Sequence, residues 1–166
     1  DRLLYFFDEF RFGTHSKLGH GWFPKGKRIP VKVKLGFQNF YLYSAVSPQN
    51  GEDFTMILPL VNTVCMNIFL QQMSQHLGSK KALIVMDCAS WHKSQSLSVP
   101  SNISVMLLPP YSPELNPVER LWRYIKQNTI KNKVFDTLAA LEIEISDFIN
   151  SIQPQTLKSL CSLNYL

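Results

Sequence analysis

Three acidic residues stand in sequence contexts that could bring their carboxylates to one site. Asp8 and Asp87 each follow a short apolar run, and Glu119 follows an Asn-Pro pair. Carboxylate oxygens are the ligands that Mg²⁺ and Mn²⁺ prefer, and two such ions about 3.5–4 Å apart can bind both the attacking and the leaving oxygen of a phosphoryl transfer. The three residues therefore predict two-metal phosphodiester chemistry.

The two aspartates are predicted at the ends of buried strands over residues 2–8 and 82–87. Each segment is a short apolar run that stops at an acidic residue. In open α/β sheets, ligands collect outside the carboxyl ends of the strands, so Asp8 and Asp87 are expected to face one crevice. Glu9 comes next on an extended chain, which turns its side chain to the opposite face. We therefore expect Glu9 to form a salt bridge or to face solvent.

Glu119 is predicted on the first turn of a helix. Three prolines between residues 109 and 113 keep the preceding chain out of the helical conformation, Asn116 fits the N-cap and Pro117 fits the first helical position. Glu119 then falls three residues after the cap, where, judged alone, a capping box is the favoured explanation and needs no metal ion. Glu114, on the preceding turn, is a competing third carboxylate. An apolar stripe continues the helix through Val118, Leu121, Trp122 and Ile125.

Three segments of the chain resemble the catalytic domain of DDE transposases, in the bacterial insertion-sequence group related to the Tc1/mariner superfamily. The first comprises residues 5–9 and 21–26, the second residues 84–94 and the third residues 108–122. The third segment, in which a Glu follows Asn-Pro-x, is long enough to be a specific signal. Together the segments extend over most of the chain.

The resemblance implies that Asp8, Asp87 and Glu119 are the catalytic triad and the metal ligands. It implies an α/β fold of the RNase H-like type, a mixed sheet with helices on both faces, and two Mg²⁺ or Mn²⁺ ions as cofactors. The implied reaction is phosphodiester hydrolysis and strand transfer, with transposon ends and target DNA as partners and a homodimer as the active assembly. Helix-turn-helix modules of the group are expected outside this chain, which would be a single catalytic domain over residues 1–166.

One departure from the group's pattern leaves other functions open. Cys88 stands where the group usually has Asn, and a thiol cannot supply the hydrogen bonds of an amide. One alternative is a nuclease of the same fold that does not transfer strands. Another is a decayed or repurposed copy that binds DNA or a partner without catalysis, against which the intact triad argues.

Two polar residues near the triad are candidate accessory residues, and basic residues gather around them. His92 could orient a phosphate or a water, or serve only packing and hydrogen bonding, and Asn116 caps the predicted helix. Basic clusters on both sides of the crevice could neutralise phosphates next to a scissile bond. Aromatic residues could stack on unpaired bases, and the candidates are Trp22, Phe23 and Trp91. The candidate DNA-binding residues are Lys25, Lys27, Arg28, Lys93, Arg120, Arg123 and Lys126.

Composition limits the class of protein. The chain has 166 residues, of which 45% are hydrophobic, and this suits one domain with a sizeable core. Its net charge of +5 is compatible with nucleic acid, and no apolar run approaches the roughly 20 residues of a membrane span. Three widely spaced cysteines argue against a zinc site or a disulfide framework and favour a reducing, cytosolic compartment. The resemblance implies that this is the bacterial cytoplasm, in association with the nucleoid. Asp1 is no initiator Met, so a fragment is expected.

The remaining elements follow from periodicity and turn signals. We expect a hairpin over residues 20–47 with turns at 26–27 and 38–39, and a loop over 48–51. A helix is predicted over 60–77, with Gly78 as its stop. A weak helical turn at 92–97, a strand over 103–108, helices over 117–131 and 136–150 and a short last helix within 154–166 complete the prediction. The apolar face of the helix over 60–77 is expected to consist of Val61, Val64, Ile68, Met73 and Leu77.

Overall fold

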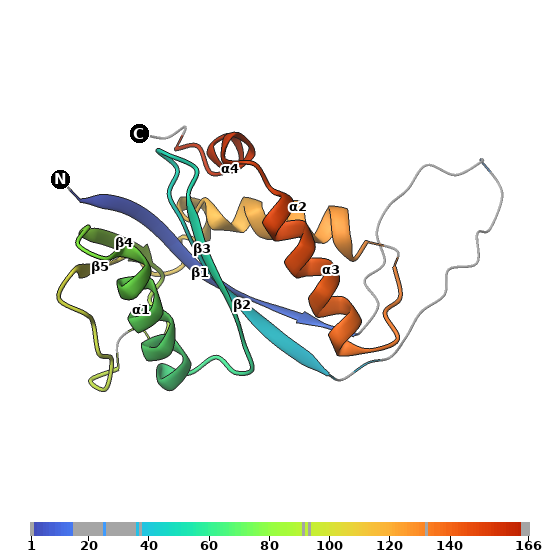
Figure 1. Cartoon of the computed structure of the whole chain (residues 1–166), viewed down its shortest axis with the longest axis horizontal. Coiled ribbons are helices and arrows are strands. Elements are labelled where there is room, and N and C mark those ends of the chain that lie inside the picture. The colour runs from blue at the N-terminus through green and yellow to red at the C-terminus, as the bar shows by residue number, and fades with distance from the viewer. Residues whose placement is uncertain are drawn as a thin grey trace.

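The computed structural model describes residues 2–14, 25, 36, 38–90, 92, 94–131 and 133–163. Along the chain, three strands precede α1, two more strands follow it, and the remaining elements are helices (Figure 1). The strands are β1 (Leu3–Gly13), β2 (Asn39–Val46), β3 (Asp53–Leu58), β4 (Ala82–Met86) and β5 (Ile103–Leu107). The helices are α1 (Thr63–Leu77), the 3₁₀ helix η1 (Pro113–Leu115), α2 (Val118–Thr129), α3 (Leu138–Ser151) and α4 (Pro154–Leu160).

The five strands form one mixed sheet with the order β3-β2-β1-β4-β5. β1 pairs with β2 and β2 with β3 in antiparallel fashion, whereas β1 pairs with β4 and β4 with β5 in parallel. α1 packs on one face of the sheet, and α2, α3 and α4 pack on the other, as the two hydrophobic clusters show. The predicted mixed sheet with helices on both faces is therefore confirmed.

β1 is longer than the sequence indicated, and the prediction that it stops at Asp8 is wrong. Its parallel pairing with β4 covers only residues 3–6, but its antiparallel pairing with β2 continues to Gly13. Phe10 and Phe12 continue the apolar alternation on the face that Phe6 occupies. Asp8 therefore lies two residues beyond the last β1–β4 pair and still inside the strand.

Much of the predicted hairpin over residues 20–47 lies outside the described residues, and its expected turn at 38–39 is wrong. Asn39 begins β2 and is no turn residue, because β2 pairs with β1, with Asp8 opposite Ser44. The expected turn at 26–27 lies outside the described residues. The expected loop at 48–51 is present and joins β2 to β3, a strand that we did not predict. Gly51 adopts φ 74°, and the carbonyl oxygen of Pro154 lies 2.1 Å from where a Cβ atom would stand, so only glycine fits there.

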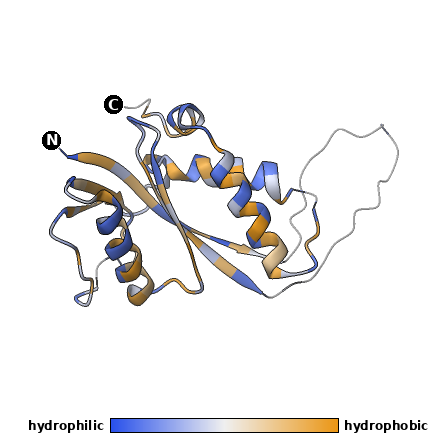
Figure 2. Cartoon of the chain, viewed as in Figure 1, coloured by the Kyte–Doolittle hydropathy of each residue, from blue (hydrophilic) through white to orange (hydrophobic). Residues whose placement is uncertain are grey.

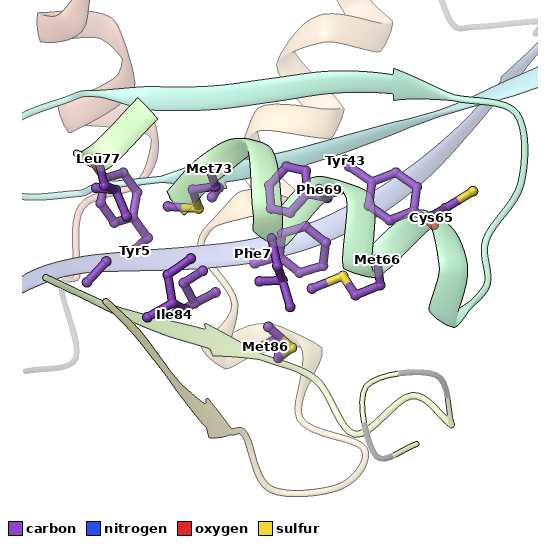
Figure 3. Packing of buried hydrophobic residues seen from close by; sticks show 14 of the residues in the cluster. Tyr5, Phe7, Tyr43, Cys65, Met66, Phe69, Met73, Leu77, Ile84 and Met86 are labelled. Atoms are coloured by element: carbon purple, nitrogen blue, oxygen red, sulfur yellow. The ribbon is translucent and has the colours of Figure 1, made fainter. Parts of the chain in front are cut away.

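Helix α1 begins at Thr63, three residues later than predicted, because Asn62 caps it by accepting a hydrogen bond from the Cys65 N–H (2.8 Å). Gly78, with φ 58°, ends it as expected. The predicted apolar face is partly wrong, since the side chains of Val64 (66% exposed) and Ile68 (41%) point outward. The buried face lies about one residue further along and contacts β1 and β4 (Figure 3); it consists of Cys65, Met66, Phe69, Leu70, Met73 and Leu77.

The second half of the chain follows the prediction closely. β5 and the last three helices lie within a few residues of their expected positions. Figure 2 shows hydrophobic and hydrophilic residues alternating along α1 and α3, as helices with one buried face require. The expected helical turn at 92–97 is absent from the described residues there, where the Leu97 N–H bonds to the Ser94 carbonyl in a simple turn. Within the described residues, no helix is long and apolar enough to cross a membrane.

Candidate active site

A cleft of about 430 Å³ opens beyond the end of the β1–β4 ladder. All three predicted carboxylates line it, as does the predicted accessory residue Asn116. The other walls come from the end of β4 and from the proline-rich loop before α2. The lining residues are Asp8, Asp87, Cys88, Ala89, Leu108, Pro109, Pro110, Tyr111, Ser112, Pro113, Asn116 and Glu119.

The register of the sheet explains why the two aspartates meet. The last parallel pair is Phe6 with Val85, and Asp8 and Asp87 each lie two residues beyond it. Phe6 and Val85 both belong to the hydrophobic cluster on the α2 side. Side chains two residues apart on a strand share a face, so Asp8 follows Phe6 toward α2, the helix that carries Glu119.

Asp8 is partly buried and holds a proton unusually strongly. Burial raises its pKa from the ordinary 3.8 to about 7, assisted by the nearby charges of Glu119 and Glu9. The Trp122 Nε1–H donates a hydrogen bond to Asp8 Oδ2 at 2.8 Å and opposes this rise. The carboxyl group of Asp8 is therefore poised between its protonated and ionised forms near neutral pH.

Asp87 is exposed, but one of its oxygens is firmly held. Oδ1 accepts a hydrogen bond from the Ala89 N–H at 3.0 Å and lies 2.8 Å from Nδ1 of His92. The side chain is 57% exposed. Both bonds end on Oδ1, so Oδ2 retains its lone pairs for a ligand in the cleft.

Glu119 lies exposed on the first turn of α2 and is not part of a capping box. The Asn116 N–H, which a capping-box glutamate would bind, donates instead to the Pro113 carbonyl at 2.9 Å. The expected cap itself is present, because Asn116 Oδ1 accepts from the Val118 N–H at 3.2 Å. Asn116 Nδ2 also donates to the Phe7 carbonyl at 2.9 Å, which ties the start of α2 to β1 beside Asp8.

The donor chemistry of the cleft fits a hard divalent cation, although the carboxylates are not closed around one point. Three carboxylates from β1, the end of β4 and α2 are the donor set that Mg²⁺ or Mn²⁺ prefers. Among the described residues, however, no three His, Cys, Asp or Glu side chains converge tightly enough to hold a metal ion. Ion binding would therefore require the carboxylate side chains to move inward.

His92 is buried and bridges two acidic residues. Its side chain is 1% exposed, with Nε2 2.9 Å from Glu9 Oε1 and Nδ1 2.8 Å from Asp87 Oδ1. Burial lowers the His92 pKa, but the hydrogen bond with Glu9 and the charges of Glu9 and Asp87 outweigh it, so the net pKa is raised. The Glu9 side chain is only 6% exposed, which confirms the predicted salt bridge and excludes the solvent-facing alternative.

A sequence profile of the family described as DDE superfamily endonuclease matches residues 3–142. The chain belongs to the DDE superfamily endonucleases. This match includes every residue of the predicted triad.

This DDE endonuclease chain is similar in sequence to two known proteins and in fold to the Mos1 transposase. An uncharacterized protein, y4pE/y4sA, of Sinorhizobium fredii (strain NBRC 101917 / NGR234) is 38% identical over 96 residues, which are 57% of this chain and 71% of that protein. The Tc3 transposase of Caenorhabditis elegans is 27% identical over 158 residues, 93% of this chain and 42% of that protein. The crystal structure of the Mos1 mariner paired end complex with Mn has a TM-score of 0.77 at 14% identity, covering 95% of this chain and 51% of the Mos1 chain.

These findings confirm the predicted RNase H-like fold and the resemblance to DDE transposases of the Tc1/mariner type. The DDE endonuclease chain spans about half the length of the Mos1 chain and less than half that of the Tc3 transposase. The insertion-sequence group and the metal ions stay predictions.

The candidate DNA-binding residues of the DDE endonuclease differ in their surroundings. Arg120 is engaged within the fold, because its Nε and a terminal nitrogen donate to the carbonyls of Leu160 and Ser162 at the end of α4. Lys126 Nζ lies 4.4 Å from the centre of the Phe10 ring. Lys25 and Arg123 are exposed. Other candidates, Lys27, Arg28, Lys93, Trp22, Phe23 and Trp91, lie outside the described residues.

Two other predicted residues near the cleft, Glu114 and Cys88, have different surroundings. Glu114, the competing carboxylate, is exposed on η1 and does not line the cleft of the DDE endonuclease. Cys88 lines the cleft, and its thiol donates to the Leu108 carbonyl at 3.1 Å. This bond joins the end of β4 to the start of the proline-rich loop, so the thiol supports the cleft wall. Cys65, Cys88 and Cys161 are all free, as predicted.

Sequence reasoning missed two features of the site. Trp122 was expected only in the core; it is fully buried and also donates to Asp8. Tyr111 was not singled out, yet it is fully exposed on the cleft wall with φ 58°, an unusual backbone conformation for a residue other than glycine. Its place between Pro110 and Pro113 in a rigid loop was the only sequence signal for it.

Proposed function

We propose that this chain is the catalytic domain of a DNA transposase of the insertion-sequence group, with Asp8, Asp87 and Glu119 as its catalytic triad. The proposal rests mainly on one observation: these three carboxylates, from three distant parts of the sequence, line a single cleft in a DDE endonuclease chain. The reaction would be hydrolysis of a phosphodiester at a transposon end, followed by attack of the freed 3′-hydroxyl on target DNA.

The triad would hold two Mg²⁺ or Mn²⁺ ions, which when bound lower the pKa of a water and neutralise the charge on the transferring phosphoryl group. Asp8 would give up its proton as it becomes a ligand, because its pKa lies near 7. Asp87 would bind through Oδ2, since His92 and the Ala89 N–H hold Oδ1. Glu119 is exposed on α2 and can turn toward the cleft.

DNA would lie across the mouth of the cleft, with basic side chains against its phosphates. Lys25 and Arg123 are the exposed candidates among the described residues. Arg120 is a weaker candidate than the sequence suggested, because its guanidinium already binds two carbonyls of the chain. Transposon ends, target DNA and a homodimeric assembly are part of this proposal, in keeping with the paired end complex formed by Mos1.

The first test is Mn²⁺ binding by calorimetry and by anomalous diffraction from soaked crystals, for the wild type and for Asp87→Ala. Ions among the three carboxylates, lost in the variant, would support the proposal. Plasmid nicking with Mn²⁺ should then be lost in Asp8→Asn and Glu119→Gln but kept in Glu114→Gln, a matched control outside the cleft. A wild-type chain that neither binds Mn²⁺ in the presence of DNA nor nicks it would overturn the proposal in favour of a repurposed DNA-binding copy.

Strand transfer is tested separately with a labelled oligonucleotide that ends in a 3′-hydroxyl and a plasmid as target. Joining of the label to the plasmid would support transposase chemistry. Nicking without joining, in a chain that binds both DNAs, would favour the nuclease of the same fold.

A further inference from the structure

The two aspartates of the cleft lie beyond the last β1–β4 pair, although Asp8 still pairs with Ser44 of β2. The backbone ladder between β1 and β4 ends at Phe6 and Val85, two residues before Asp8 and Asp87. Among the described residues, no β1–β4 pair lies beyond that point, so no backbone pairing joins Asp8 directly to Asp87. Two metal ligands on neighbouring strands that no longer pair at that level need another connection if their carboxylates are to keep a constant separation.

A side-chain bridge spans the gap on the opposite face of the sheet. Glu9 follows Asp8 on β1 and faces the α1 side, where its Oε1 lies 2.9 Å from His92 Nε2. The other ring nitrogen of His92 lies 2.8 Å from Asp87 Oδ1. The bridge therefore runs from the residue next to one aspartate to the carboxylate of the other.

The bridge is rigid because its middle member is packed. The His92 side chain is 1% exposed and stands edge-on to the Phe7 ring, with ring centres 5.6 Å apart. The His92 N–H also donates to the Ala89 carbonyl at 3.0 Å, which fixes the turn after β4. This buried imidazole thus has a carboxylate oxygen within hydrogen-bond distance of each ring nitrogen.

We propose that His92 is a positioning residue, which, supported by Glu9, holds Asp87 Oδ1 and thereby presents Oδ2 to a divalent cation. His92 itself does not touch the cation or the DNA. The inference rests on the proposed function for the cation, but the orientation of Asp87 is a property of the chain alone.

Two substitutions separate positioning from simple packing. In His92→Asn, the amide nitrogen can take the place of Nδ1 and donate to Asp87, whereas in His92→Gln it can take the place of Nε2 and reach Glu9 only. Positioning predicts that His92→Gln weakens Mn²⁺ binding about 10-fold, in the range seen when outer ligand contacts are lost, while His92→Asn stays within about 3-fold of the wild type. If His92 serves only as the hydrogen-bond partner of the buried Glu9, His92→Asn should weaken Mn²⁺ binding more than His92→Gln does.

The measurements are calorimetric Mn²⁺ affinity, thermal stability and a metal-free crystal structure of each variant. Asp87 should keep its orientation in His92→Asn and lose it in His92→Gln, even if both variants unfold at a lower temperature. Equal Mn²⁺ affinities for the wild type and His92→Gln, or an unchanged Asp87 in that variant, would overturn the inference. If the wild type binds no Mn²⁺, the proposed metal site fails, and the metal-free crystal structures alone decide whether His92 positions Asp87.

Discussion

Replacing Asp8 by Asn should stabilise the metal-free chain while it destroys the proposed activity. Asp8 is partly buried beside Glu119, and its raised pKa shows that the folded chain disfavours the ionised form. Asn keeps an oxygen that can accept the Trp122 N–H, which now donates to Asp8 Oδ2. The substitution thus removes an unfavourable charge without removing the hydrogen bond.

The size of the effect follows from the pKa of Asp8. A carboxyl whose pKa is 3.8 when the chain is unfolded and about 7 when it is folded binds a proton more tightly in the folded state between these values. The free energy of unfolding therefore falls as the pH rises through this window, and at about 1.4 kcal/mol per pH unit the total cost is about 4 kcal/mol above pH 7. Asp8→Asn should gain about 1 kcal/mol over the wild type at about pH 4.5 and about 4 kcal/mol at about pH 8.

The assay is urea unfolding of the wild type and the variant at both pH values, with EDTA present. His92 also titrates, with a pKa raised above its ordinary value, so it too loses stabilisation as the pH rises, but it does so in both proteins and cancels in the difference. Glu114→Gln is the matched control, because Glu114 is exposed on η1 outside the cleft and its replacement leaves the groups around His92 in place. A gain that does not grow with pH, or a loss of stability at about pH 8, would refute the reasoning. Mn²⁺ should stabilise the wild type and leave Asp8→Asn unchanged, as measured by thermal unfolding.

Three further predictions concern neighbours of the cleft. Trp122→Phe removes the donor that lowers the Asp8 pKa, so the midpoint of the pH dependence of wild-type stability should move upward, as urea unfolding at several pH values would detect. Asn116→Ala loses a helix cap and a bond to β1, and should cost about 1–3 kcal/mol in unfolding free energy and weaken Mn²⁺ binding, because Glu119 is carried on that helix. Arg120→Ala should lower the melting temperature and leave the salt dependence of DNA binding unchanged. Arg123→Ala should keep the melting temperature and reduce by about one the slope of the logarithm of the binding constant against the logarithm of the salt concentration. The opposite pattern would make Arg120 a DNA-binding residue.

Local patterns in the sequence were sufficient for about half of the architecture. The apolar run before Asp87 and the proline and cap signals before Glu119 predicted β4 and the start of α2, since each depends on neighbouring residues. β1 was predicted too short because its extension depends on pairing with β2, more than 25 residues away in sequence, and propensity does not reveal pairing. The face of α1 was misplaced by about one residue because Val64 and Ile68 are apolar yet exposed.

The same limit applies to the site. The acidic residues were found because their sequence contexts are distinctive, and the structure brings all three to one cleft. The contact between Glu9 and His92 joins residues 83 positions apart, and that between Asp8 and Trp122 joins residues 114 positions apart. Such pairs are set by the register of the sheet and the packing of α2, neither of which a single sequence displays.

The hydrogen bond between Trp122 and Asp8 also provides the chain with an internal optical probe. Indole fluorescence responds to the charge and polarity around the ring, and this indole donates directly to the carboxylate that would change its charge. The chain has three tryptophans, so Trp22→Phe combined with Trp91→Phe would leave Trp122 as the sole tryptophan, which can be excited apart from the tyrosines. Proton release from Asp8 and the arrival of a cation could then be followed in real time, without a dye, from a ring that is itself shielded from solvent.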